Sequence, residues 1–238
     1  MLPFRVNYAA AIVFVSLACA PASSSSRGAE STSAANNTVA ATVPKTDTTK
    51  SKDPDVVRAD LARIAGNPAA KLWVVVVSDF QCPYCKQWHD DAYETFRRDY
   101  VETGKVRFAY INYPLNSHQN AWPAAQTAMC AAAQDKFWPM HEALFATQQQ
   151  WEILSPPTPF LDSLARSLNL DMKRFTDCVS SGKMRGLIQA DHDRALAAGA
   201  TSTPTFIIGG KLVVGAIPLA EMRAAVDSAL AQAGKSTP

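Results

Sequence analysis

The sequence lacks long apolar runs, internal repeats and an excess of charge of either sign. Its 238 residues carry 23 Lys and Arg against 21 Asp and Glu, a formal net charge of +2. This even balance gives no electrostatic basis for binding nucleic acid or an acidic surface. The N-terminal apolar run, Ala9–Ala18, has about half of the roughly 20 residues that a membrane-spanning helix needs. With 47% hydrophobic residues, the chain is long enough for one domain of roughly 180 residues with extra segments.

The N-terminal apolar run instead indicates an export signal. Arg5 supplies a positive charge before it. Small residues follow in the small-x-small pattern of a cleavage site, at Ala18, Ala20 and Ala22. We expect residues 1–22 to be a signal peptide. The mature protein is then expected in the periplasm or at the outer face of the cell envelope, where disulfides persist.

Cys19 offers a second interpretation of this signal. Leu17-Ala18-Cys19 resembles part of a bacterial lipoprotein signal, in which the cysteine is acylated after cleavage. Such signals usually carry an aliphatic residue three positions before the cysteine, where this chain has Ser16. Lipidation of Cys19, and with it a membrane tether, therefore stands beside a plain signal peptide as an alternative.

The segment that follows, residues 23–55, is almost free of large apolar side chains. Ser, Thr, Ala and Asn dominate it, and Val39 and Val43 are the exceptions. Such a segment cannot bury enough surface to offset the entropy lost on ordering. We expect a disordered linker, which suits a tethered enzyme that must reach its clients and suits an ordinary linker nearly as well.

Cysteines are few, and two of them form a Cys-x-x-Cys motif. Cys82 and Cys85 lie between Leu72–Val77, an apolar, β-branched run typical of a buried strand, and the segment 86–100, which has the mixed pattern of a surface helix. The dithiol is therefore expected where a strand ends and a helix begins. Unpaired backbone N–H groups and the helix dipole favour the reactive thiolate of Cys82 there.

Two other roles are open to such a pair of cysteines. It could be half of a zinc site or a permanent structural disulfide. Zinc needs four ligands, and neither a second Cys-x-x-Cys nor a close His pair follows at finger spacing. The strand–motif–helix context favours redox chemistry, and the sequence indicates no metal.

Two cysteines remain, Cys130 and Cys178. In an oxidising compartment two spare thiols are expected to pair in a structural disulfide. The alternative is that both are small buried apolar residues. The apolar helical run around Cys130, residues 128–133, fits that alternative as well.

The rest of the chain predicts an α/β fold with an all-helical insertion. A second core strand is expected over 106–113, and a hairpin with a Gly209-Gly210 turn over 206–214. Between them lie about 85 mostly helical residues, in which Asp171 is a plausible N-cap. A final amphipathic helix is expected over 219–233.

Several of these segments resemble the DsbA-like proteins, exported thioredoxin-fold thiol–disulfide oxidoreductases with an inserted helical domain. The segment around Cys82-Pro83-Tyr84-Cys85 resembles their active site, and Ala198–Phe206, which contains Thr203-Pro204, resembles their cis-proline loop. Phe137–Phe145 resembles a helix of their insertion. The resemblance covers about residues 60–232. It implies a thioredoxin-like domain over 56–114 and 200–234 and a helical insertion over 115–199.

The resemblance also implies roles for individual residues. Cys82 corresponds to the exposed nucleophile and Cys85 to the buried partner that resolves the mixed disulfide. Pro83 and Tyr84 would set the stability of the Cys82 thiolate. A substrate peptide would bind at Thr203-Pro204, and whether Pro204 is cis is left open. The implied partners are exported client proteins with cysteines and a membrane redox partner, either a quinone-linked oxidase or a reductase, with no metal or organic cofactor.

One position departs from the pattern. Many members of this fold carry a buried acid six residues before the first cysteine, where it assists proton transfer at the buried thiol; here that residue is Val76. Asp79 is closer to the motif and is a candidate for proton transfer. It is also a candidate cap for the turn before the helix, and we favour this capping role. His118 is a further candidate near the active site, although a structural role at a helix start is favoured for it.

The direction of the redox reaction is the main question that the sequence leaves open. The same fold serves oxidases, reductases and isomerases, and Pro-Tyr between the cysteines also occurs in glutaredoxins. We favour an oxidase because of the expected compartment. A second class of function is a non-catalytic peptide-binding module with a permanent structural disulfide at Cys82 and Cys85.

Overall fold

A five-stranded mixed sheet lies at the centre of the structure, in the order β1-β3-β2-β4-β5. The computed structural model describes residues 51–235. Strands β2 and β3 are parallel, and the other neighbouring pairs are antiparallel. The strands are β1 (Ile64–Gly66), β2 (Leu72–Ser78), β3 (Val106–Asn112), β4 (Thr205–Ile208) and β5 (Lys211–Val214).

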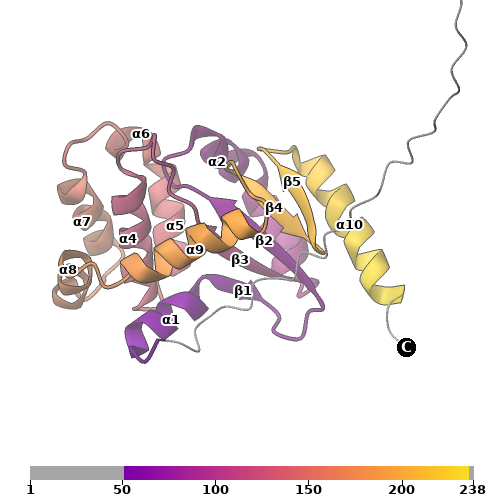
Figure 1. Cartoon of the computed structure of the whole chain (residues 1–238), viewed down its shortest axis with the longest axis horizontal. Coiled ribbons are helices and arrows are strands. Elements are labelled where there is room, and N and C mark those ends of the chain that lie inside the picture. The colour runs from indigo at the N-terminus through magenta and orange to yellow at the C-terminus, as the bar shows by residue number, and fades with distance from the viewer. Residues whose placement is uncertain (1–50, 236–238) are drawn as a thin grey trace, which may run out of the picture. The chain divides into compact units, whose positions relative to one another are not determined.

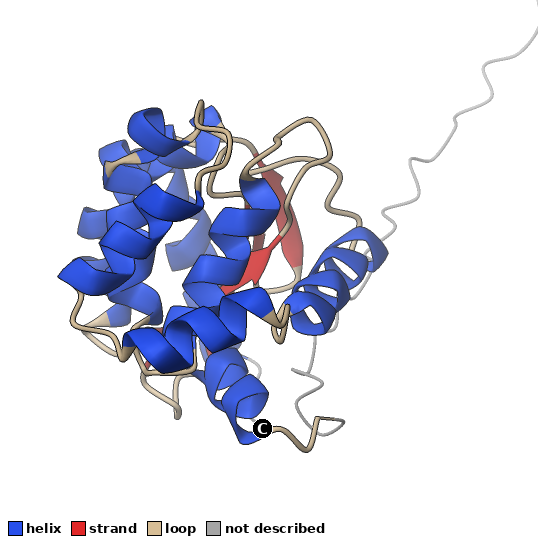
Figure 2. Cartoon of the chain, turned by 90° about the vertical axis from the view of Figure 1, so that its left-hand side faces the viewer, coloured by secondary structure: helices blue, strands red, loops and turns tan. Residues whose placement is uncertain are grey.

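Helices pack around this sheet. In the order in which they follow along the chain, they are α1 (Pro54–Ala62), α2 (Pro83–Trp88), the π-helical η2 (His89–Tyr93), α3 (Glu94–Phe96), the π-helical η3 (Arg97–Val101), α4 (Ala121–Ala132), α5 (Phe137–Ala146), α6 (Gln148–Trp151), α7 (Thr158–Ser167), α8 (Met172–Ser180), α9 (Arg185–Ala197) and α10 (Leu219–Lys235). Helices α4 to α9 all fall between β3 and β4. Figure 1 shows α4, α5, α7 and α8 gathered at one end of the sheet and α10 at the other, and Figure 2 shows the helices in front of the strands. None of the described helices is long and apolar enough to cross a membrane.

The sequence of β2 explains why it is the central strand. Its β-branched side chains are buried on both faces of the sheet, as expected for a strand with neighbours on both sides. Val74 and Val76 enter the larger hydrophobic cluster, whereas Val75 and Val77 enter a smaller one on the other face. The predicted strand over 72–77 is confirmed, and its end at Ser78 sets the start of the active-site turn.

The structure corrects two predictions about helices. The predicted linker over 23–55 overlaps the first helix, because α1 begins at Pro54 with the Asp53 side chain accepting a hydrogen bond from the backbone N–H of Asp55 at 2.9 Å. Residues 1–50, with the predicted signal peptide and Cys19, lie outside the described residues. The segment 86–100 is helical, but it contains two π-helical stretches and carries buried aromatic side chains, among them Trp88 and Phe96. A sequence pattern does not separate α turns from the wider π turns.

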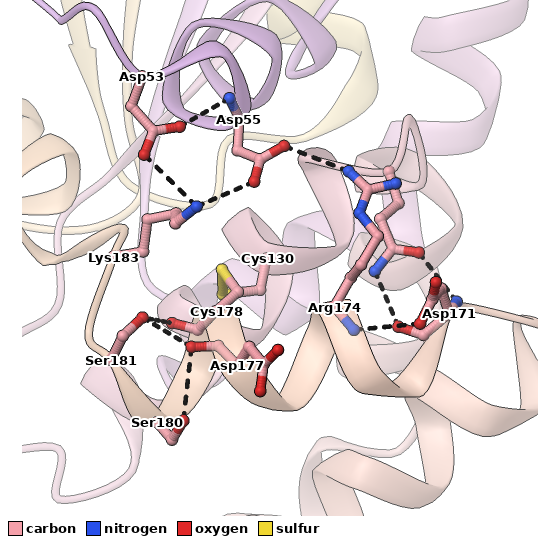
Figure 3. Close-up of a disulfide and its surroundings, with 11 residues drawn as sticks. Asp53, Asp55, Cys130, Asp171, Arg174, Asp177, Cys178, Ser180, Ser181 and Lys183 are labelled. Atoms are coloured by element: carbon pink, nitrogen blue, oxygen red, sulfur yellow. Dashed lines mark hydrogen bonds and ion pairs between the residues drawn. A yellow bond between two sulfur atoms is a disulfide. The ribbon is translucent and has the colours of Figure 1, made fainter.

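Two helices of the insertion are linked covalently. In the structure Cys130 of α4 and Cys178 of α8 form a disulfide with a Cα–Cα distance of 5.8 Å (Figure 3). Beside it, Lys183 lies 3.0 Å and Arg174 lies 3.2 Å from carboxylate oxygens of Asp55. These ion pairs connect the start of α1 to the region around α8. The predicted N-cap Asp171 begins α8, with its side chain accepting from the N–H of Arg174 at 3.1 Å.

A buried ionic cluster fixes α1 and β1 against the rest of the fold. The Arg63 side chain is 1% exposed and contacts the carboxylates of Asp60 and Asp191, which are both 0% exposed. It also donates to the carbonyl of Tyr110 at 3.0 Å. Asp191 belongs to α9, so the cluster joins the insertion to the start of the domain. Removing one charge would leave its partners buried without compensation, which is costly.

We predict that Arg63→Met destabilises the protein by about 3–5 kcal/mol, the cost of breaking a buried ion pair from one side. Urea unfolding followed by circular dichroism measures this change. Arg58→Met is the matched control, because Arg58 pairs with Asp135 at the surface, with side chains 54% and 67% exposed. That variant is expected to lose less than about 1 kcal/mol. Equal losses in the two variants would show that the buried cluster is not a stabilising constraint.

Candidate functional site

The two motif cysteines lie at the junction between β2 and α2. Cys82 is the N-cap of α2, and Pro83 follows in the first turn, where a missing N–H costs nothing. The backbone N–H of Cys82 donates to the carbonyl of Asp79 at 3.1 Å, and the carbonyl of Cys82 accepts from the N–H of Lys86 at 3.1 Å. The strand end and the helix start therefore meet in one tight turn. Both thiols are free.

The expected exposure of Cys82 is wrong in this structure. Cys82 is 3% exposed and Cys85 is 2% exposed, so both thiols are buried. The reason is the loop before β4, which covers the motif: the Cys82 thiol donates to the carbonyl of Thr203 at 3.4 Å. The Thr203–Pro204 peptide bond is cis. Of the dipeptide between the cysteines, Tyr84 is 63% exposed and provides the open side of the site.

The pKa values of the two thiols are shifted in opposite directions. A hydrogen bond from the Cys85 thiol lowers the pKa of Cys82 to about 6, with help from Thr203 and the backbone of Cys85 and Tyr84, against the opposing effect of burial. Burial raises the pKa of Cys85 well above its usual value, and the neighbouring Cys82 raises it further. At neutral pH this pair holds a thiolate at Cys82 and a thiol at Cys85.

Asp79 lies at the turn and not at the buried thiol. Its carboxylate accepts from the backbone N–H of Gln81 at 2.7 Å and of Leu115 at 2.9 Å, and its other contact is His118 Nδ1 at 2.7 Å. Asp79 is 2% exposed. This geometry is the capping alternative that the sequence favoured. The Asp79 backbone, by contrast, hydrogen-bonds toward Cys85 and partly offsets the rise in its pKa.

His118 has a closer connection to the site than the sequence indicated. The hydrogen bond with Asp79 raises the pKa of His118, and the negative charges of Cys82 and Glu152 add to that effect. The side chain is 21% exposed. The buried carboxyl group of Asp79 therefore favours the protonated form of His118, which is electrostatically coupled to Cys82.

Two amide side chains that the sequence analysis missed, those of Gln81 and Gln148, fix the active-site turn to the insertion. Gln148 Nε2 donates to the carbonyls of Phe80 at 2.6 Å and Cys82 at 3.1 Å. The side chain of Gln81 accepts from the N–H of Asn120 at 2.7 Å and donates to the carbonyl of Glu152 at 3.0 Å. Isolated Gln and Asn residues far apart in sequence carry no signal of such contacts.

One other group of side chains in residues 51–235 could ligate a metal ion. His89, His141 and Glu142 each offer one ligand atom, all within 4.8 Å of one another. His89 Nε2 lies 2.8 Å and His141 Nδ1 3.3 Å from oxygens of Glu142. The sequence analysis found no close His pair and indicated no metal, so it gave no signal of this group. His89 is largely buried. Its side chain is 12% exposed, because it packs on Phe145.

A dithiol at the end of the central strand, beneath a cis-proline loop, is the arrangement of a thioredoxin-fold protein. The family model described as Thioredoxin matches residues 59–228, so the chain belongs to the thioredoxin family. The family and fold expected from the sequence are thereby confirmed.

Solved structures share this fold. BdbD from Bacillus subtilis has a TM-score of 0.65 and 22% identity, covering 71% of this chain and 92% of that one. Alpha-DsbA1 from Wolbachia pipientis has a TM-score of 0.65 and 22% identity, covering 73% of this chain and 92% of that one.

Curated relatives fall into two groups. Disulfide bond formation protein D of Bacillus subtilis (strain 168) is 24% identical over 174 residues, covering 70% of this chain and 76% of that protein. Na(+)/H(+) antiporter NhaA 3 of Salinispora tropica is 34% identical over 178 residues, covering 74% of this chain and 26% of that protein. The chain thus spans about a quarter of the length of the antiporter relative.

We predict that the thiolate of Cys82 titrates with a pKa of about 6 in the reduced protein. His118→Gln removes a positive charge from its surroundings, so this variant should raise the pKa of Cys82 by about 0.5–1 unit. The pH dependence of alkylation by iodoacetamide measures it. His89→Gln is the matched control, since His89 also pairs with carboxylates but Cys82 is not among the groups that shift its pKa. An unchanged alkylation profile in His118→Gln would contradict the coupling.

Proposed function

We propose that this protein catalyses dithiol–disulfide exchange on cysteine-containing client proteins, acting as an oxidase through Cys82 and Cys85. The observation that carries the proposal is the pair of opposed pKa shifts in thiols two residues apart. Perturbed acidities of this kind concentrate at reactive sites. Relatives named for disulfide bond formation support the same chemistry, since the chain covers 76% of one of them.

Each thiol has one task in this reaction. A client thiolate attacks Sγ of Cys82 in the Cys82–Cys85 disulfide, and the electron pair of the broken S–S bond goes to Cys85. A second client thiolate then attacks the client sulfur of the mixed disulfide, and Cys82 leaves as a thiolate. The client loses two electrons and gains a disulfide, and the protein is reduced. Because Cys82 is stabilised as a thiolate, the reduced form is favoured, which makes the protein an oxidant.

The remaining functional proposals concern place and partners. We place the protein outside the cytosol, with residues 1–22 as a signal peptide and Cys19 as a candidate lipid anchor. A disulfide between Cys130 and Cys178 would suit that compartment. Each catalytic cycle leaves the dithiol reduced, so a second protein must take two electrons from it. A quinone-linked oxidase in the membrane would restore the oxidase, whereas a reductase would serve a reductase or isomerase.

The decisive test of the proposal is the fate of a reduced client in the presence of single-cysteine variants. Cys82→Ser should abolish catalysed disulfide formation, because no mixed disulfide can form. Cys85→Ser, incubated with the oxidised client, should trap a mixed disulfide that survives in a non-reducing gel, because its Cys82 thiolate attacks the client disulfide, one client thiolate leaves, and no Cys85 thiol remains to resolve the product. The Cys130→Ala/Cys178→Ala double variant is the control, and we expect it to keep the exchange reaction. Full activity in Cys82→Ser would contradict catalysis by this dithiol, whereas no activity in the unchanged protein would favour the alternative of a peptide-binding module with a structural disulfide.

The face beside the motif is suited to an extended apolar client segment. Tyr84 is 63% and Ile153 is 75% exposed. The loop that carries Ile153 is held against the active-site turn, since the carbonyl of Glu152 accepts from Gln81. Two exposed apolar side chains beside a buried nucleophile offer a surface where an unfolded chain can bind.

We predict that Ile153→Ser raises KM for an unfolded client about threefold to tenfold, the loss expected for one apolar contact. Its kcat and its reaction with a small disulfide should stay unchanged, because the thiols are untouched. Leu196→Ser is the control, as Leu196 is 46% exposed on α9. Equal KM values for Ile153→Ser and the unchanged protein would remove Ile153 from the client surface.

A further inference from the structure

The hydroxyl group of Tyr110 is buried and has no hydrogen-bond partner among residues 51–235. Tyr110 is 0% exposed, and its hydroxyl oxygen is one of the buried polar atoms without a partner. The ring is fixed by its neighbours: it stacks on Phe80 with ring centroids 4.9 Å apart and meets His141 edge-on at 5.4 Å. A phenylalanine would fill the same space without the cost of an unpaired hydroxyl. Such a buried, unpaired group needs an explanation.

The sheet register places Tyr110 on the face of the sheet whose hydrophobic cluster contains the resolving cysteine. Tyr110 of β3 lies opposite Val76 of β2, the position where many members of this fold carry a buried acid. Both side chains belong to the hydrophobic cluster that contains Cys85. Ser78 lies two residues beyond Val76 and therefore on the same face. The Ser78 side chain is near both Cys85 and Tyr110, because it lowers the pKa of each.

The phenol is suited to donate a hydrogen bond and not to exchange a proton. Burial raises the pKa of Tyr110 well above its usual value, and negative charge on Cys85 raises it further. Tyr110 therefore keeps its proton while Cys85 becomes charged. A neutral O–H donor in an apolar cluster is most effective when the charge in front of it appears only during the reaction.

We propose that the Tyr110 hydroxyl, together with that of Ser78, holds the negative charge on Cys85 Sγ when Cys85 leaves the disulfide. The proposal rests on the proposed exchange function and identifies the groups that replace the missing acid at position 76. The client thiolate forms a bond to Cys82 Sγ, the Cys82–Cys85 bond breaks, and its electron pair moves to Cys85 Sγ. The O–H groups stabilise this thiolate until it takes a proton from solvent, which balances the proton that the client thiol released.

Tyr110→Phe tests this role, because it removes one oxygen atom and keeps the ring. The measurement is the stopped-flow rate at which dithiothreitol reduces the Cys82–Cys85 disulfide, followed by tryptophan fluorescence. We expect a rate about tenfold to a hundredfold lower, as for a lost hydrogen bond to a charged group. Unfolding of the oxidised protein in urea should show unchanged or higher stability, which a structural role for the hydroxyl would not give.

One control and one further test variant accompany this measurement. Tyr113→Phe removes a hydroxyl from a residue just beyond β3 whose ring packs in the other hydrophobic cluster, against His192. It should leave the rate unchanged. Ser78→Ala removes the second donor and should slow the same step, which gives an independent reading if Tyr110→Phe fails to fold.

The proposal is overturned if Tyr110→Phe and Ser78→Ala both reduce within twofold of the unchanged protein. A different observation would show that the proposed exchange function itself is wrong. In that case the unchanged protein would not form disulfides in a reduced client, whatever the rates of these variants with dithiothreitol.

Discussion

The unequal environments of two neighbouring sulfur atoms are the constraint on which the rest of the structure depends. Cys82 sits at the start of a helix, where hydrogen bonds from the Cys85 thiol and from the backbone of Cys85 and Tyr84 lower its pKa, whereas burial raises the pKa of Cys85 one turn later. The same short turn therefore stabilises charge on one sulfur and disfavours it on the other. A buried strand that ends at Ser78 is what allows both environments within four residues.

The helical insertion takes part in the site through polar contacts and not only as a cover. Gln148 holds the backbone around the motif through the carbonyls of Phe80 and Cys82, and the backbone N–H of Asn120 donates to the side chain of Gln81. His118 pairs with the buried Asp79 and brings a positive charge into the surroundings of Cys82. The insertion thus helps to fix the geometry of the turn that carries the dithiol and contributes to its electrostatic surroundings. A disulfide between α4 and α8 and the Arg63 cluster keep that insertion in place.

Local pattern was enough to predict the core strands, the hairpin and the dithiol between a strand and a helix. The apolar, β-branched run of β2 and the Cys-x-x-Cys spacing are both short-range signals. The short β1, Arg63 between two aspartates, and the contacts of Gln81, Asn120 and Gln148 depend on residues distant in sequence. Tyr110 illustrates the limit, because its position opposite Val76 is known only once the register of β2 and β3 is known. Its hydroxyl then accounts for a site without the expected acid.

The most direct test of the central claim is the equilibrium between the reduced and oxidised forms of Cys82 and Cys85 in glutathione buffers. A thiolate stabilised at Cys82 favours the reduced protein, so we predict a potential between about −180 and −120 mV, in the range of disulfide-forming oxidants. A value near or below about −230 mV would contradict an oxidase and indicate reductive chemistry, and one below about −300 mV would indicate an inert structural disulfide.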